Sequence, residues 1–390
     1  HFGSNRGILG CVPIQIRCDS GARRIWREHI LSHMKSDLSP APPGLKENSP
    51  LCAELARQPS SPNNDPEEFE FEPEPLTADL YGCSITSIIR DVRKLFIGEG
   101  RLGLRCAKVG VTVGVLWLTI AMQIFLMVEF RRMVTKSSVH KIREMYSEYE
   151  LWMYDRNTET TSNGYHRGIP GHLIRERFSD VPDNIDKEFI CSIPFSQPYF
   201  FSCILMVWTF TVVIDLREIF FYAELLLVRT DTVASVQEIL EEREDHTVVL
   251  RGLTFPFKVL LTLLIFLPRL GIDLVLLWLG CRWLTSTASF GDVLLNAIAL
   301  EFVLLLKDLI YFAVVPKRNQ WETSTMLVPH KRKTKASWRT YLGAFAWLLV
   351  VCTWAMLYLV RFQKVLPDYR WDIHHVCEDF IDEITSLSVE

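Results

Sequence analysis

The sequence predicts an all-α membrane protein, a polytopic bundle of about five transmembrane helices that follows a disordered N-terminal tail. Three observations lead to this fold class. The stretch Val109–Val128 contains no charged side chain, and about 20 apolar residues are needed for a helix to cross the roughly 30 Å hydrocarbon core of a bilayer. Two further apolar segments of this length lie between Pro256 and Pro316, joined by a short turn. The first 78 residues, in contrast, are polar and rich in proline.

The composition and motifs exclude several classes of function. The 390 residues carry a formal net charge of -4, whereas nucleic-acid-binding domains usually have a concentrated basic face, so we expect no nucleic-acid partner. The chain has no Gly-rich phosphate loop, no GxSxG and no HExxH motif, so we expect neither an enzyme nor a cofactor. His374, Cys377 and Glu378 have the spacing of metal ligands on a helix. Because no fourth ligand accompanies them, we expect no metal site.

Residues 1–78 combine scattered basic residues with Pro, Ser and Asn and end in an acidic run. Such a segment buries too little apolar area to offset the entropy that it would lose on ordering. We therefore predict a mostly disordered tail, with a docking or phosphorylation tail as the functional alternative. Residues 79–105 then show apolar residues near helical spacing. They predict an amphipathic helix in the membrane surface or, alternatively, a short helix packed on the protein.

The apolar segments that follow define the membrane domain. The first span is predicted over residues 106–130. The loop 131–190 contains an amphipathic stretch and a turn-rich stretch, and it is expected to form a small cap outside the cytosol. Four more spans are predicted within residues 191–364, and Pro268, in the middle of the third span, is expected to kink its helix. An acidic amphipathic tail ends the chain over residues 365–390.

The orientation follows from lysine and arginine residues in short loops, which are enriched on the cytosolic side of membranes. These residues are more frequent on the side that carries the N-terminal tail. We therefore predict an integral, multi-pass membrane protein with a cytosolic N-terminus and a non-cytosolic C-terminus. Cys191 and Cys377 then share the non-cytosolic side and are candidates for a disulfide. Two free thiols are the alternative, because the sequence does not determine the distance between them.

Charged residues inside the apolar segments are the candidate functional residues, because an isolated charge at such depth costs several kcal/mol. Counted from the turn between the third and fourth spans, Arg269 and Glu301 lie about eleven and ten residues deep. We expect them to form an ion pair near the bilayer centre. Asp273, one helical turn from Arg269, is expected to share the same guanidinium.

A second group of charges is expected closer to the cytosol. Lys307 and Asp308 lie about sixteen and seventeen residues from the same turn, and Asp215 lies about eighteen residues into the second span. We therefore expect Lys307 to pair with Asp215 or with Glu218, which follows Asp215 by three residues.

Two classes of function fit this charge network. In one, the network lines an ion or solute path in an ion-channel-like or solute-transport-associated protein. In the other, the ion pairs only lock the helices of a non-catalytic scaffold or of a subunit of a larger membrane complex. An unpaired carboxylate would favour transport. The expected partners are the lipid bilayer, a small ion or solute, and a homo-oligomer or a larger membrane complex.

Several short motifs between the second span and the end of the fourth carry a resemblance. They are Leu267-Pro268-Arg269, Trp283-Leu284-Thr285, Phe290 followed by Asp292, Asn296, Ala299-Leu300, Phe302-Val303 and Val315-Pro316. Through them, the stretch of about residues 189–318 resembles a group of multi-span membrane proteins that are abundant in dinoflagellate algae. The resemblance implies a source and a helical membrane topology, and it does not distinguish transport from scaffolding.

Overall fold

The computed structural model describes residues 69–98, 102–182, 185–243, 247–333, 338–378 and 380. These residues all belong to one unit of the chain, which spans Glu67–Glu390. Residues 1–68 of the predicted N-terminal tail and residues 381–390 of the predicted acidic tail lie outside the described residues.

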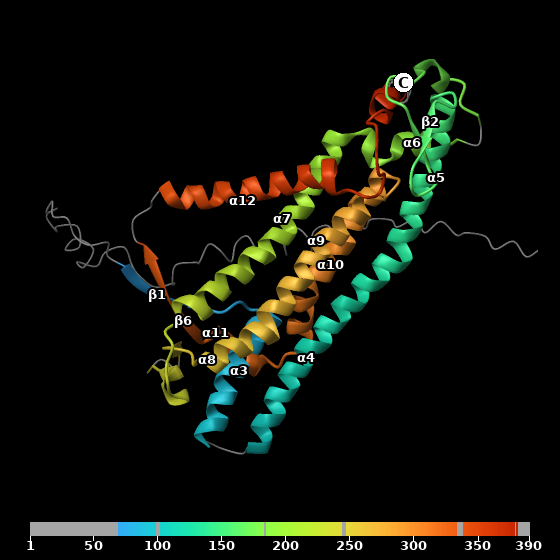
Figure 1. Ribbon diagram of the computed structural model, residues 1–390. Helices are drawn as coiled ribbons and strands as arrows, with labels where there is room; N and C mark the ends of the chain where they lie inside the picture. The colour runs from blue at the N-terminus through green and yellow to red at the C-terminus, as the bar shows by residue number, and fades with distance from the viewer. Residues whose placement is uncertain are drawn as a thin grey trace, which may run out of the picture. The chain divides into compact units, whose positions relative to one another are not determined.

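The described chain is mostly helical (Figure 1). The α-helices are α3 (Leu80–Ile97), α4 (Leu102–Glu129), α5 (Lys136–Met153), α6 (Lys187–Ser192), α7 (Pro198–Ala223), α8 (Phe255–Leu261), α9 (Leu267–Thr285), α10 (Phe290–Val314), α11 (Lys317–Ser324) and α12 (Trp338–Leu357). Segments of π-helix extend or join them at Phe130–Thr135, Glu224–Arg229, Thr262–Phe266 and Tyr358–Phe362. Single turns of 3-10 helix lie at Arg175–Phe178, Pro194–Ser196 and Val236–Ile239.

Four helical stretches of the described chain are long and apolar enough to cross a membrane. They are Leu102–Met153, Pro198–Arg229, Phe255–Thr285 and Tyr341–Phe362. The first is a continuous helix of 52 residues, which is longer than a bilayer requires. The predicted cap therefore begins as an extension of the first span. Helix α10 is not among the four, because Glu301, Lys307 and Asp308 interrupt its apolar sequence.

Helices α7 and α9 lie side by side, and a glycine makes their close approach possible (Figure 1). A Cβ atom on Gly280 of α9 would lie 2.5 Å from the indole ring of Trp208 on α7. No larger residue fits there without moving the ring, so this contact resembles the small-residue packing of membrane helices. Pro268 lies two residues after the π-helical turn Thr262–Phe266, inside the continuous helical stretch Phe255–Thr285, and this turn accommodates the backbone hydrogen bond that proline cannot donate.

The prediction of an all-α chain omits two small sheets. A four-stranded sheet has the order β1-β6-β5-β4, and β2 pairs with β3 in a hairpin. The strands are β1 (Phe69–Pro75), β2 (Thr158–Thr160), β3 (His166–Gly168), β4 (Leu240–Glu242), β5 (Val248–Leu250) and β6 (Met326–Lys333).

Strand β1 lies in the range predicted to be disordered. Its sequence FEFEPEP alternates apolar and acidic residues, a period that suits a strand. Strand β1 pairs antiparallel with β6, and the register places Glu70 opposite Arg332 and Glu72 opposite His330. The acidic run that suggested disorder thus pairs with a basic segment more than 250 residues away, and local sequence gives no sign of such a partner.

Helix α3 packs on α4, α10 and α11. Side chains from Leu80 to Ile89 are buried, including the polar Ser84, Thr86 and Ser87. Of the two arrangements considered for this helix, the structure has the one in which it packs on the protein. This packing brings the N-terminus of α3 to the charged residues of α7, α9 and α10.

Candidate functional site

The charged residues of the apolar helices meet where four helices come together. Asp215 and Glu218 project from α7 three residues apart, Arg269 comes from α9, and Lys307 from α10. Asp79, the residue that caps the N-terminus of α3, completes the group. We call these five residues together with Asp273 and Asp308 the charge cluster.

Arg269 is the most highly paired member of the charge cluster. Its Nη2 atom donates to carboxylate oxygens of Asp215 and Glu218, and its Nη1 atom lies 3.7 Å from Oδ2 of Asp79. The guanidinium also lies over the ring of Tyr81, 4.6 Å from the ring centroid, in a cation–π contact. Only 3% of Arg269 is exposed, so these groups take the place of the water that would otherwise surround the guanidinium.

Lys307 is the second base of the cluster. Its Nζ atom donates to Asp215 and lies 3.6 Å from Oε2 of Glu218. Asp215 therefore bridges Arg269 and Lys307. Through these contacts, the two acids of α7 attach α9 and α10 to the same face of α7. The structure thus brings together Lys307, Asp215 and Glu218, the residues that depth counting placed near one level.

The predicted pair between Arg269 and Glu301 is wrong. Arg269 pairs with acids of α7 and α3, and Glu301 forms no ion pair with any described residue. Depth counting sets the height of a residue but not its direction around the helix. Lys307 faces α7, and Glu301, six residues away, points about 120° from it because each residue turns the helix by about 100°.

Two acids of the cluster have no ion pair within the described chain. Asp273 is only 2% exposed, and its Oδ2 atom has no hydrogen-bond partner. The prediction that it shares the guanidinium of Arg269 is therefore wrong, because the Nη atoms of Arg269 are directed to Asp215, Glu218 and Asp79.

Asp308 is half-buried, and the positive charge that attracts it is that of Lys307. Lys307 nevertheless directs its amine to the acids of α7. Both Asp273 and Asp308 interact electrostatically with Asp215 and Glu218, which carry the same charge.

Sequence reasoning missed Asp79 and Tyr81. The Oδ1 atom of Asp79 accepts hydrogen bonds from the backbone N–H of Gly82 at 2.7 Å and from the hydroxyl of Thr77 at 3.0 Å. An aspartate directly before an apolar helix is a common N-cap, so the cap was visible in the sequence. Its second role, the contact of Oδ2 with Arg269, depends on tertiary packing.

The described cluster contains more acids than bases. Its carboxyl groups are those of Asp79, Asp215, Glu218, Asp273 and Asp308, and its bases are Arg269 and Lys307. Two cations cannot neutralise five carboxylates in a site of low dielectric constant. Such a site is suited to hold a further positive charge, either a proton on a carboxyl group or a small cation.

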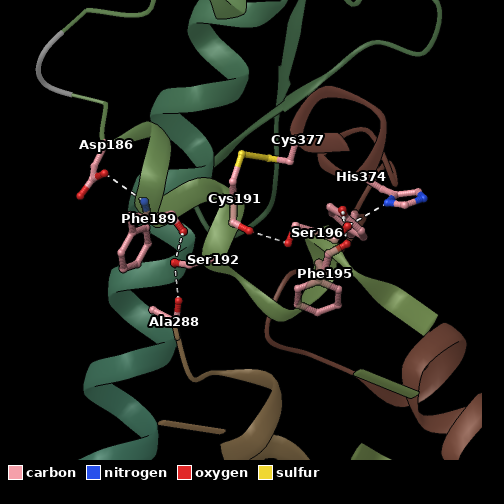
Figure 2. Close-up of a disulfide and its surroundings, with 10 residues drawn as sticks. Asp186, Phe189, Cys191, Ser192, Phe195, Ser196, Ala288, His374 and Cys377 are labelled. Carbon is pink, nitrogen blue, oxygen red and sulfur yellow. Dashed lines mark hydrogen bonds between the residues drawn. A yellow bond between two sulfur atoms is a disulfide. The ribbon is translucent and has the colours of Figure 1, made fainter. Parts of the chain in front are cut away.

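A disulfide lies at the opposite end of α7, in the segment predicted to be non-cytosolic. Cys191 and Cys377 are bonded, with 5.4 Å between their Cα atoms (Figure 2). The hydroxyl of Ser196 donates to the carbonyl of Cys191 at 2.6 Å, and Nδ1 of His374 lies 2.8 Å from the carbonyl of Ser196. The disulfide therefore ties the segment before α7 to the C-terminal segment.

The same C-terminal segment closes a buried polar cluster over α5. Asp372 accepts hydrogen bonds from the hydroxyls of Tyr146, at 2.8 Å, and Tyr154, at 3.2 Å. Burial raises the pKa of the Asp372 carboxyl above its usual value. Nearby, Arg167 and Glu150 form a 3.2 Å ion pair, and each side chain is at most 1% exposed. Several polar side chains of this region therefore pair with one another away from water, whereas the Tyr149 hydroxyl and the Nη2 atom of Arg167 are buried without a hydrogen-bond partner in the described chain.

Among the described residues, no group of three or more His, Cys, Asp or Glu side chains has the arrangement of a metal site. Comparison of the chain with family models, with curated proteins and with solved structures finds no match. The function is therefore argued from the charge cluster itself.

Proposed function

We propose that this chain is a polytopic membrane protein that moves small cations across the bilayer through the charge cluster, and that protons are the species held by the cluster. The observation that carries the proposal is the surplus of buried carboxyl groups, above all Asp273, whose Oδ2 atom is buried without a partner. Ionisable residues inside membranes commonly mark ion paths and proton relays.

The proposal includes α10 as a fifth span. Its exposed side chains are large and apolar, and they recur at helical spacing along one face. They are Leu294, Leu295, Ile298, Phe302, Leu305, Leu309 and Phe312. Such a face is unfavourable in water and favourable in lipid. Lys307, on the same helix, is turned inward to the acids of α7. A helix with a lipid-compatible face and an inward charge suits a membrane position beside α9.

In the proposed cycle, Asp273 accepts a proton, and Arg269 and Lys307 hold the remaining acids in place. Both bases contact Asp215, so a charge added to or removed from one carboxyl group changes the attraction that joins three helices. The number of protons that the cluster holds therefore affects the positions of the helices, and a transport cycle requires such a coupling. In this proposal the N-terminus lies in the cytosol, as the sequence predicts, and the disulfide lies on the non-cytosolic side.

A scaffold function is the second candidate, because the ion pairs of Arg269 and Lys307 directly join α3, α7, α9 and α10. In a scaffold, the same pairs would hold a fixed arrangement of helices and carry no flux. The two functions make different predictions for an acid that has no ion pair. Asp273 forms no ion pair with any described residue, so its charge should matter more for transport than for a scaffold.

The test is proton uptake into proteoliposomes, measured with an entrapped pH-sensitive dye under an imposed potassium diffusion potential. We compare the full chain with the Asp273→Asn variant. Glu224→Gln is the matched control, since Glu224 is an exposed acid that pairs with Arg229 at 2.8 Å outside the cluster. The proposal expects uptake by the wild type and by Glu224→Gln, and at least a tenfold loss in Asp273→Asn. Equal rates in all liposomes, including empty ones, would support the scaffold function.

A further inference from the structure

A second site lies between α3, α4, the end of α10 and α11, outside the charge cluster. These elements enclose a groove with a volume of about 630 Å³, which is within the usual range of ligand pockets. One wall of the groove is apolar and includes Val111 and Val115 of α4 together with Val314 and Val315 at the end of α10. Because Val111 is 66% exposed and Leu104 is 72% exposed, this wall is open to the lipid that would surround α4.

The other wall of the groove is strongly basic. It carries Arg90, Lys94, Arg105, Lys108 and Arg318, against only two acids, Asp91 and Glu322. The two acids are already paired within the groove. Glu322 contacts Lys108 at 2.7 Å, Arg318 at 3.1 Å and Arg90 at 3.9 Å, and Lys108 also lies 3.3 Å from Asp91.

Two bases of this wall keep no partner of their own. Within the described chain, neither Lys94 nor Arg105 forms an ion pair or a hydrogen bond through its side chain. Burial, together with the positive charges of Arg90 and Arg105, lowers the pKa of the Lys94 amine. Because five bases line the groove against two acids, the electrostatic potential there is positive, and an anion placed between Lys94 and Arg105 would be attracted.

We propose that this groove binds one anionic phospholipid, with its phosphate between Lys94 and Arg105 and one acyl chain along Val111 and Val115. Charge complementarity supports the headgroup, since lysine and arginine bind phosphate through charge-assisted hydrogen bonds. The apolar wall supports a lipid over free phosphate, because a soluble ion would leave that wall uncovered. Basic pockets beside membrane helices on the cytosolic side commonly bind such headgroups, and this groove lies on the side predicted to face the cytosol.

The bound lipid would join three elements that the ion pairs already bring together. Lys94 belongs to α3 and Arg105 to α4, and α11 contributes Glu322, whose contacts hold Lys108 and Arg90 in place. A phosphate between Lys94 and Arg105 would relieve the repulsion between the two helices. The inference stands on this groove alone and does not depend on the function proposed for the charge cluster.

The test uses the purified full chain in detergent and native mass spectrometry, titrated with dioleoyl phosphatidic acid or dioleoyl phosphatidylcholine. We expect one phosphatidic acid to bind at a concentration about tenfold lower than phosphatidylcholine, and Lys94→Gln or Arg105→Gln each to weaken its binding about tenfold. Arg93→Gln is the matched control, because Arg93 lies on the same helix but donates to the carbonyl of Gln237 at 3.2 Å. It should bind as the wild type does.

Two results would overturn the proposal: equal binding of the two lipids by the wild type, or displacement of phosphatidic acid by millimolar inorganic phosphate alone. Photolabelling of the wild-type protein tests the site without a variant, in case a variant does not fold. Phosphatidic acid with a photoreactive acyl chain should label peptides from residues 104–115 or 314–322, which line the groove. Labelling confined to other helices would also contradict the proposal.

Discussion

The Nη1 atom of Arg269 lies 3.7 Å from Oδ2 of Asp79, so the cap residue of an amphipathic helix contacts a buried arginine of an apolar helix. Asp79 thereby has two functions: one oxygen fixes the start of α3, and the other attaches that start to α9. Helix α3 is consequently part of the helical unit and not a separate surface element. The charge cluster depends on this attachment as well as on the apolar helices.

Removing the central base should destabilise the protein strongly. In Arg269→Gln, the buried carboxylate of Asp215 and the partly buried carboxylate of Glu218 lose their shared donor. Breaking a buried ion pair by deleting one partner costs about 3–5 kcal/mol. We expect a large loss of the monodisperse fraction on size-exclusion chromatography and a lower melting temperature in detergent. Arg217→Gln, at an exposed position of α7, is the control and should behave as the wild type; similar melting of both variants would contradict the role of Arg269.

The contact between α7 and α9 gives a second prediction, which concerns a single methyl group. In Gly280→Ala the new Cβ atom would lie 2.5 Å from the ring of Trp208, and overpacking of this kind costs about 1–3 kcal/mol. Gly271, in the same helix, has no atom within 4 Å of the corresponding position, so Gly271→Ala should be neutral or stabilising by up to about 1 kcal/mol. Thermal melting of the two variants in the same detergent measures the difference, and equal melting temperatures would show that the helices do not pack as described.

Loss of the disulfide should loosen the C-terminal segment specifically. The bond joins residues separated by 186 positions, and removal of a native disulfide commonly costs about 2–5 kcal/mol. We expect Cys377→Ser to speed proteolysis by trypsin near Arg370, whereas Cys203→Ser, at an exposed free cysteine, should leave the rate unchanged. Mass spectrometry of the fragments checks this result. The same rate in both variants would contradict the structural role of the disulfide.

The raised pKa of Asp372 predicts how stability depends on pH. The carboxyl group binds its proton more tightly in the folded chain than in the unfolded chain, because it is buried. Below the unfolded pKa of about 4 both states are protonated. As pH rises above that value, the unfolded state releases its proton first, so the free energy of unfolding falls until the folded pKa is passed.

The Asp372→Asn variant tests this dependence, since its side chain does not titrate. Melting temperatures measured between pH 4 and pH 8 should fall more steeply with rising pH in the wild type than in the variant. Because Tyr146 and Tyr154 donate to different oxygens of Asp372, the asparagine carbonyl can replace only one of these acceptors, so the slope of the profile with pH and not the absolute melting temperature is compared. Parallel profiles for the two proteins would mean that Asp372 does not contribute to the pH dependence.

The apolar helices and the members of the cluster were largely visible in the sequence, because long apolar runs and charges within them are local features. Depth counting, from the turn for Lys307 and from the start of the second span for Asp215, placed the two residues near one level, and the structure brings them together. The same counting failed for Arg269 and Glu301, because height along a helix does not determine the direction in which a side chain points. That direction is set by the packing of whole helices.

Tertiary pairing explains what the sequence did not predict. Strand β1 forms only because β6, far along the chain, supplies its partner, and a strand needs such a partner for its backbone hydrogen bonds. The contact of Asp79 with Arg269 arises in the same way. The disulfide between Cys191 and Cys377 was one of two alternatives, and the distance that decides between them is available only from the fold.

The central claim, that the charge cluster carries protons, is tested most directly by a reversal potential. The purified wild-type chain is incorporated into planar bilayers, and current is recorded while opposed gradients of protons and of potassium chloride are applied. The account predicts a current that reverses near the proton equilibrium potential and follows it when the pH gradient is changed. A current that reverses at the potassium or chloride potential, or no current from protein with its disulfide intact, would contradict the account.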